Sequence, residues 1–366
     1  MIDNGFHHTR RREHRRKATE GRGGEHQFDQ AHPGVAAVLS LPVRRRSLLT
    51  AWLLLAAKTS WGASGGPPAR IGWLKIQGPQ HTPDQLKAFR EGMRALGLIE
   101  GRDYVLEQRY ADNDSARLPN LVTELLNKGV SIIVATSQPS IVASARVTKH
   151  VPVIGRMNDD PVVDGMAQSL ARPGGNITGV YAMTEELNAK RLSLLKEAVP
   201  SLRRVGVLLQ PNWSSEEHDW QVALVAARQL NLEILALNVR SSDDIAAALE
   251  HASAQKVGGI MTFRNPTVVT YLKVIAELCQ KHRLPAVFDA REYVAAGGLM
   301  SYGPNIDAIY RQLATYVGKL LHGTPASELP IEQPTTFELV INLKTARALG
   351  LTIPQSILAR ADEVIE

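Results

Sequence analysis

The chain has 366 residues, of which 44% are hydrophobic and 21% charged, a composition typical of a globular protein with room for more than one domain. Its net charge of +6 is concentrated at the start: residues 1–46 hold ten Lys and Arg against five Asp and Glu, which leaves +1 for residues 47–366. A body so close to electroneutrality lacks the basic surface of a nucleic-acid-binding protein, so no nucleic acid is expected as a partner.

The first seventy residues predict an export signal behind a polar extension. Residues 1–43 lack apolar periodicity and are expected to be disordered. In residues 44–69, predicted to be a signal peptide and linker, three arginines precede the apolar core Leu48–Ala57, and small residues allow cleavage near residues 62–64. This core is too short for a stable transmembrane helix, so we expect an exported, periplasmic protein. A twin-arginine route, an uncleaved membrane tether and a buried N-terminal helix remain open.

From residue 71 the chain alternates short apolar strands with amphipathic helices. The strands are expected at residues 71–76, 104–110, 131–136 and 151–154, and the helices are expected to start after Thr82, near Leu118 and at Pro139. Helices between apolar, β-branched strands predict parallel βαβ units with both faces of the sheet covered.

This alternation stops at residues 172–176, where one proline and two glycines prevent regular structure, and then resumes. Further strands are expected at residues 204–209, 232–237, 258–263 and 285–288, with helices that start near Ser214, Ser242 and Thr267. The sequence therefore predicts an α/β protein with two doubly wound parallel-sheet lobes, and residues 172–176 are expected to cross between them.

Ligands of open parallel sheets bind beyond the carboxyl ends of the strands. This rule selects loops rich in hydroxyl, amide and carboxylate groups, which predict a cleft for a small polar ligand. They are residues 77–82, 136–139 and 155–161 in the first lobe, and residues 210–215, 263–266 and 288–292 in the second.

Residues 136–138 are expected at a helix N-terminus, where free amides and the helix dipole favour a carboxylate. Asp159 and Asp160 could accept hydrogen bonds from an ammonium group, and Trp213 or Phe263 could stack on an apolar part of the ligand. Helix capping by Ser137 and by Asp160 is the alternative to ligand contact.

No chemistry beyond binding is expected. The chain contains no nucleotide-binding, hydrolase, metalloprotease or redox motif, and of the histidines after residue 70 only His81 falls in a predicted cleft loop. The single cysteine, Cys279, is expected on the apolar face of a helix as a buried structural thiol. We therefore expect no catalytic residue, no metal and no cofactor.

Five segments in a fixed order resemble one family. They are DDPV (159–162), SLARPGGNITGV (169–180), KRLSLLKEAVP (190–200), AGGLMSYGPN (296–305) and FELVINLKTARALGLTIP (337–354). From residue 70 to the end, the sequence resembles the ABC-transporter substrate-binding proteins of the tryptophan-binding-protein-like group, which have the type I periplasmic binding fold. The resemblance implies a monomer whose two lobes, joined by a three-segment hinge, close over an amino acid or related compound, aromatic ones among them. It also implies delivery of that ligand to an ABC permease in the inner membrane.

Carried over by position, the resemblance places residues 70–180 with 293–333 in lobe 1 and residues 181–292 with 334–366 in lobe 2. Asp160 matches the family's aspartate before proline, whereas Trp213 and Arg264 depart from the pattern. The implied hinge residues are Thr178, Gly179, Asp289, Ala290, Gln333 and Pro334. The predicted ligand-binding residues are Gln80, Thr136, Ser137, Gln138, Asp159, Asp160, Trp213, Phe263 and Asp289.

Two other functions remain possible for such a chain. A two-lobed α/β enzyme would need an acid/base pair in the cleft, for which Asp160 with His81 or Glu292 is the available set. A ligand-sensing domain of a receptor would need an attached output module, and the sequence ends at Glu366 without one. The export signal, the neutral body and the lack of catalytic motifs favour the binding protein.

Overall fold

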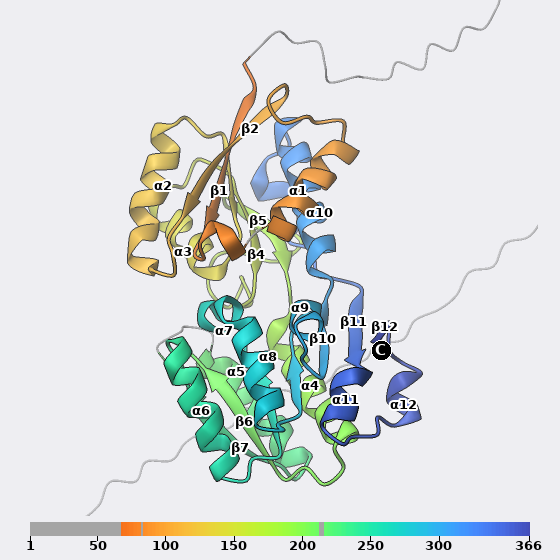
Figure 1. Ribbon diagram of the computed structural model, residues 1–366. Coiled ribbons are helices and arrows are strands. Elements are labelled where there is room, and N and C mark those ends of the chain that lie inside the picture. The colour runs from red at the N-terminus through yellow and green to blue at the C-terminus, as the bar shows by residue number, and fades with distance from the viewer. Residues whose placement is uncertain (1–66, 82, 212–215) are drawn as a thin grey trace, which may run out of the picture. The chain divides into compact units, whose positions relative to one another are not determined.

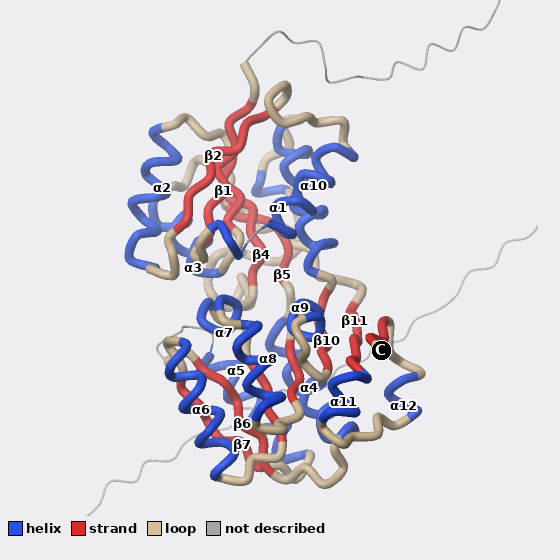
Figure 2. The backbone as a smooth tube through the Cα atoms, viewed as in Figure 1, coloured by secondary structure: helices blue, strands red, loops and turns tan. Residues whose placement is uncertain are grey.

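Figures 1 and 2 show the fold of a computed structural model that describes residues 67–81, 83–211 and 216–366. All of these residues belong to one compact unit, which spans residues 59–366. The predicted N-terminal extension, the signal peptide with its cleavage site, and Trp213 lie outside the described residues. Within the described part, no helix is both long and apolar enough to cross a membrane.

Sheet A contains five parallel strands in the order β2-β1-β3-β4-β5. The strands are β1 (Ala69–Lys75), β2 (Tyr104–Tyr110), β3 (Ile132–Ala135), β4 (Val153–Met157) and β5 (Ile177–Tyr181). Residues of β3, β4 and β5 are buried throughout, because helices cover both faces of the sheet. This double burial explains why the strands are continuous apolar runs in the sequence.

Two helices cover each face of sheet A (Figure 1). They are α1 (Pro83–Ala95) with α10 (Ile306–Leu321), and α2 (Leu118–Asn127) with α3 (Gln138–Val147). Trp73 of β1 packs against Phe89 of α1 and Tyr310 of α10, with ring centroids 5.3 and 5.8 Å apart. A Cβ atom on Gly92 would lie 2.7 Å from that of Ala314, so glycine permits the close approach of α1 and α10. A segment distant in sequence thus completes this half of the molecule.

Sheet B contains seven strands in the order β12-β11-β10-β9-β8-β6-β7. All neighbours are parallel except β10 and β11, which are antiparallel. The strands are β6 (Arg204–Leu209), β7 (Glu233–Asn238), β8 (Gly259–Thr262), β9 (Ala286–Phe288), β10 (Met300–Pro304), β11 (Phe337–Asn342) and β12 (Glu363–Ile365).

The helices around sheet B begin at capping residues where the sequence supplies them. Ser241 accepts a hydrogen bond from the Asp244 amide at the start of α6, close to the predicted start at Ser242. Cys279 is buried on α8, as predicted, and burial raises the pKa of its thiol to about 12. The helices are α4 (Thr184–Ala198), α5 (Glu216–Gln229), α6 (Ser242–Ala254), α7 (Pro266–Thr270), α8 (Leu272–Lys281), α9 (Arg291–Ala295), α11 (Leu343–Ala348) and α12 (Gln355–Leu358). Short 3-10 turns occur at η1 (Pro79–His81), η2 (Ser115–Arg117) and η3 (Ala326–Glu328).

Three segments connect the part built on sheet A, here called lobe 1, with the part built on sheet B, called lobe 2. The first leads from β5 to α4, the second joins β10 to α10 at Asn305, and the third runs from Glu332 to β11. Backbone contacts hold them side by side: the Tyr181 amide donates to the Glu332 carbonyl at 2.9 Å, and Pro304 is paired with Phe337. The prediction of two α/β lobes is confirmed.

Of the predicted hinge positions, Gln333 and Pro334 lie in one of these segments, and Thr178 and Gly179 precede another. Thr178 and Gly179 lie in β5, where the Thr178 hydroxyl donates to the Leu329 carbonyl at 2.8 Å. Gly179 has φ of 137°, and a Cβ atom there would lie 2.1 Å from a backbone oxygen of β4, so only glycine fits. Gln333 and Pro334 lie in the third crossing.

Three expectations about the crossings are wrong. Residues 172–176 form a loop that leads into β5 of sheet A, so the chain crosses only after that strand. Asp289–Ala290 connect β9 to α9 inside lobe 2, and residues 293–304 also belong there, because β10 pairs with β9 through Met300 and Val287. The pattern of the sequence identifies an apolar strand but does not show which sheet the strand joins.

Candidate functional site

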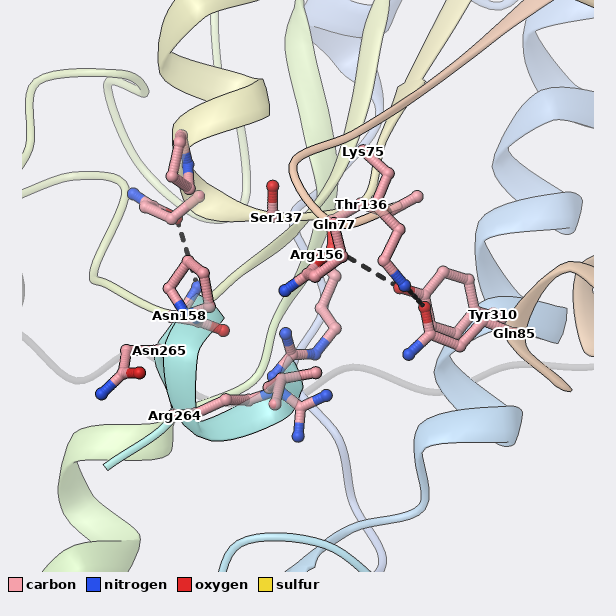
Figure 3. A pocket seen from close by; sticks show the side chains of 14 residues that line it. Lys75, Gln77, Gln85, Thr136, Ser137, Arg156, Asn158, Arg264, Asn265 and Tyr310 are labelled. Carbon is pink, nitrogen blue, oxygen red and sulfur yellow. Dashed lines mark hydrogen bonds between the residues drawn. The ribbon is translucent and has the colours of Figure 1, made fainter. Parts of the chain in front are cut away.

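A pocket lies between residues that end or follow strands of both sheets (Figure 3). Lobe 1 contributes ten of its lining residues and lobe 2 contributes four. They are Lys75, Gln77, Gln85, Thr136, Ser137, Gln138, Pro139, Arg156, Asn158 and Tyr310 from lobe 1, and Arg264, Asn265, Pro266 and Val269 from lobe 2. The rule that ligands bind at the carboxyl ends of parallel strands therefore selects the correct edge of each sheet.

Lys75, the last residue of β1, is only 2% exposed although it is cationic. Its Nζ atom donates to Gln85 Oε1 at 2.6 Å and to the His81 carbonyl at 3.0 Å. Burial, with repulsion from Arg264 and Arg156, lowers the pKa of Lys75 well below its usual value. Both hydrogen-bond acceptors are neutral, so they satisfy two of the three ammonium protons without compensating the charge.

Arg156 is the second buried cation and lies in β4, 3% exposed. Its Nε and Nη2 atoms have no hydrogen-bond partner among the residues that the structure describes. Burial, with repulsion from Arg264, lowers the pKa of this guanidinium to about 10, which still leaves it charged at neutral pH. A buried guanidinium with two unused donors is costly, and it is the kind of group that a bound anion would satisfy.

Arg264 is the third cation of the pocket and follows β8 in lobe 2. Its Nη1 atom lies 2.6 Å from Asp289 Oδ2 in an ion pair whose side chains are 10% and 2% exposed. Burial opposes the charge of Arg264, but Asp289, together with Tyr293 and Glu292, outweighs burial and raises the pKa of the guanidinium. Asp289 therefore faces the cation and holds it, and the carboxylate itself does not line the pocket.

The N-terminus of α3 supplies neutral polar groups. Ser137 precedes the helix in an extended conformation, but its side chain does not cap it, and its Oγ atom lies 2.7 Å from that of Ser140. The Gln138 side chain accepts a hydrogen bond from the Asn158 backbone amide at 3.2 Å and donates one to Asp164 at 3.0 Å, so both ends of its amide group are held. The alternative that Ser137 caps the helix with its side chain is thus contradicted.

Asn265 is positioned by a buried carboxyl. Its Oδ1 atom caps α7 by accepting from the Val268 amide at 2.8 Å, and its Nδ2 atom donates to Glu216 Oε1 at 2.6 Å. Glu216 also accepts from the Gln210 amide, and burial raises the pKa of Glu216 to about 7 despite both hydrogen bonds. The orientation of a pocket side chain is therefore coupled to a group that titrates near neutral pH.

We expect the stability of the protein to fall between pH 5 and pH 8 because of Glu216. Its folded-state pKa of about 7 lies above the ordinary value of 4.5, so deprotonation of the unfolded chain favours unfolding as the pH rises through this interval. The loss should be about 1–3 kcal/mol. Glu216→Gln should remove this slope in urea unfolding at pH 5, 6, 7 and 8, whereas Glu217→Gln on the exposed side of α5 should keep it. Parallel pH profiles for the wild type and Glu216→Gln would contradict the assignment.

Only some of the residues predicted for the site line the pocket. Thr136, Ser137 and Gln138 line the pocket, whereas Asp160 accepts from the Val162 amide at 2.8 Å and caps its own loop. Phe263 is buried in the core of lobe 2, where it cannot stack on a ligand.

The remaining predicted residues lie beside the pocket. Asp159 is buried but is not a lining residue, and Gln80 lines an adjoining groove together with His81 and Glu292. The acid/base set of the enzyme alternative is therefore divided between this groove and the capped loop of Asp160. Among the described residues, no group of three or more His, Cys, Asp or Glu could hold a metal ion.

Sequence reasoning missed the two cations that lie within strands. Lys75 and Arg156 interrupt the apolar runs IGWLKI and VPVIGRM, in strands expected to be buried on both faces. A charged residue at such a position is rarely buried without a partner or a function, so this interruption is the signal that could have identified both.

Comparisons with known proteins identify a family and a more distant relative of this chain. The sequence profile of a family described as ABC transporter substrate binding protein matches residues 78–365. A protein of Clostridioides difficile (strain R20291) named tyrosine-binding protein is 23% identical over 270 residues, which cover 72% of this chain and 76% of the relative.

Two solved structures share the fold. A conserved domain protein from Vibrio cholerae superposes with a TM-score of 0.75 at 23% identity and covers 81% of this chain and 100% of its own. An ABC domain in complex with L-Trp from Streptococcus pneumonia superposes with a TM-score of 0.74 at 23% identity, covering 82% of this chain and 100% of its own. At this level of identity the two structures establish a common architecture.

Proposed function

The chain belongs to the family of ABC transporter substrate-binding proteins, with the type I periplasmic binding fold, and we propose that it is the extracytoplasmic component of an importer. In this proposal, the two lobes close over a small ligand of the amino-acid type or a related carboxylate. The closed protein then delivers the ligand to a permease in the inner membrane.

One observation carries the proposal: a pocket lined by both lobes contains a buried guanidinium with two unused donors. Arg156 from lobe 1 and Arg264 from lobe 2 both line it, so a carboxylate placed there would contact both halves of the protein. A ligand that touches both lobes binds the closed form selectively and shifts the population towards it. The permease would recognise this closed form.

The arrangement of the crossings supports closure as the response to the ligand. The three segments lie side by side, linked through the Val180–Glu332 bridge and the Pro304–Phe337 pair, so rotation about them would change the separation of the lobes with little change inside either sheet. Thr270 of lobe 2 also donates a hydrogen bond to Asn113 of lobe 1 at 3.3 Å. Such a contact would stabilise the closed state.

Export to the periplasm is part of the proposal and rests on the family and on the predicted signal peptide, with cleavage near residues 62–64. N-terminal sequencing of the secreted protein tests it directly. A mature protein that begins within residues 60–66 would support export, whereas an intact N-terminus on a cytoplasmic protein would overturn it.

A thermal-shift screen of the full chain, unfolded and refolded to remove bound ligand, tests the proposed function. A ligand at about one hundred times its dissociation constant should add about 2.7 kcal/mol to the free energy of unfolding and raise Tm by several degrees. Amino acids and small carboxylates should produce this shift and be recovered unchanged. Turnover of the compound would support the enzyme alternative, and no shift with either class would overturn the proposal.

A further inference from the structure

Building on the proposed function, we propose that the ligand of this pocket is an organic anion with two acidic groups, such as a dicarboxylate. A neutral zwitterion, such as tyrosine or tryptophan, has the wrong charge for the same site. The inference rests on the charges that line the pocket, on which of them are already paired, and on the geometry of the unused donors.

The lining has an excess of positive charge. Lys75, Arg156 and Arg264 all point into the pocket (Figure 3), and none of the described residues that line it is an Asp or a Glu. The carboxylates that act electrostatically on these cations are Asp289, which is paired with Arg264, and Glu292, which lies in the adjoining groove and whose pKa is raised by burial. An ammonium group of a ligand in the described pocket would therefore lie next to positive charges and amide oxygens.

Only one of the three cations has an acidic partner. Arg264 is held by Asp289 at 2.6 Å, whereas Lys75 bonds to two neutral oxygens and Arg156 forms no ion pair in the described part of the chain. Two buried cationic side chains thus lack an ion-pair partner within the described residues, which is costly in a site of low dielectric constant. A ligand with two negative charges would compensate both, and a zwitterion would bring a third positive charge beside them.

The free donors of Arg156 define how one acidic group would bind. Nε and Nη2 are the nitrogens whose N–H bonds run parallel along one edge of a guanidinium, and this edge fits the two oxygens of a carboxylate. The second acidic group would then lie towards Lys75, whose ammonium is a compact donor without a preferred fork geometry. The α3 amides next to Ser137 would add neutral donors.

Isothermal titration of the full, ligand-stripped chain with matched acid and amide pairs tests the inference. The pairs are succinate with succinamate and L-glutamate with L-glutamine, and L-tyrosine, L-tryptophan and inorganic phosphate complete the set. In at least one pair, the acid should bind about 10- to 100-fold more tightly than its amide, since the amide loses one charge-assisted contact. Tighter binding of phosphate than of either dicarboxylate would assign a phosphoryl group as the acidic group, within the same inference.

Three variants test which side chains produce the difference in affinity between acid and amide. Arg156→Gln should weaken binding of the preferred acid by about 100-fold or more, because it removes the forked contact and a buried charge. Lys75→Met should weaken the acid more than its amide, and this comparison stays informative if Arg156→Gln does not fold. Arg311→Gln, on the exposed surface of α10 and outside the pocket, should leave both affinities unchanged.

The outcomes separate this inference from the proposed function. Equal affinity for acid and amide, or tighter binding of L-tyrosine or L-tryptophan than of each acid, would overturn the dianion and leave a substrate-binding protein for neutral amino acids. No binding by any member of the set would overturn both.

Discussion

Asp289→Ala should lower the free energy of unfolding by about 3–5 kcal/mol, the range measured when one partner of a buried ion pair is removed. The carboxylate is 2% exposed and lies 2.6 Å from Arg264, and the positive charge of Arg191 also acts on it. Without Asp289, these two buried guanidinium groups would lose a shared counter-charge. Urea unfolding at pH 7 measures the effect.

The pH dependence of this loss gives an independent check. Burial opposes the ionisation of Asp289, but Arg264 and Arg191 outweigh it and lower the pKa of the carboxyl below its ordinary value of 3.8. The stabilisation is therefore complete above pH 3.8 and is lost as the pH falls through the lower folded-state pKa. The difference between the wild type and Asp289→Ala should be constant from pH 5 to 8 and shrink in acid.

An exposed ion pair provides the matched control. Glu363→Ala removes the partner of Arg291, whose side chain is 50% exposed, and should cost no more than about 1 kcal/mol. Equal losses for Asp289→Ala and Glu363→Ala would show that burial does not set the strength of the Arg264–Asp289 pair.

The two-lobed fold could be predicted because its cause is local. Parallel strands buried on both faces must be apolar throughout, and IIVA at residues 132–135 and RVGVLL at residues 204–209 show this directly. The assignment of β10 could not be predicted in the same way. Its residues are compatible with either sheet. Only the pairing of β10 with β9 and with the antiparallel strand β11 assigns it to sheet B.

The sequence indicated which loops line the candidate pocket, but it did not indicate most of the individual side chains that do so. Strand direction places residues 136–138 at the carboxyl edge of sheet A, and all three residues line the pocket. Asp160 caps its own loop instead of lining the pocket, because a carboxylate before proline serves equally well as a loop cap and the local backbone decides between the two roles. The inward direction of Arg156 depends on the register of β4 in sheet A, which no local pattern determines.

Because the register of β4 buries the guanidinium of Arg156, this side chain should destabilise the ligand-free protein. Arg156→Met should raise the free energy of unfolding of the stripped protein by about 1–4 kcal/mol, because a hydrophobic side chain of similar length removes an uncompensated buried charge. The folded-state pKa of about 10 lies below the ordinary 12.5, so the penalty is complete at neutral pH and declines only above pH 10. Each kcal/mol corresponds to roughly 2–4 °C in Tm for domains of 150–250 residues.

Ligand should reverse this order of stability. A bound anion at about one thousand times its dissociation constant adds about 4.1 kcal/mol to the wild type, whereas Arg156→Met, which cannot form the forked contact, should gain little at the same concentration. Thermal unfolding of both proteins with and without succinate or L-glutamate measures the crossover. A variant that is less stable than the wild type when stripped would mean that Arg156 is already compensated within the fold. A stripped variant that is more stable and unresponsive to ligand would show a buried charge retained for binding at the expense of stability.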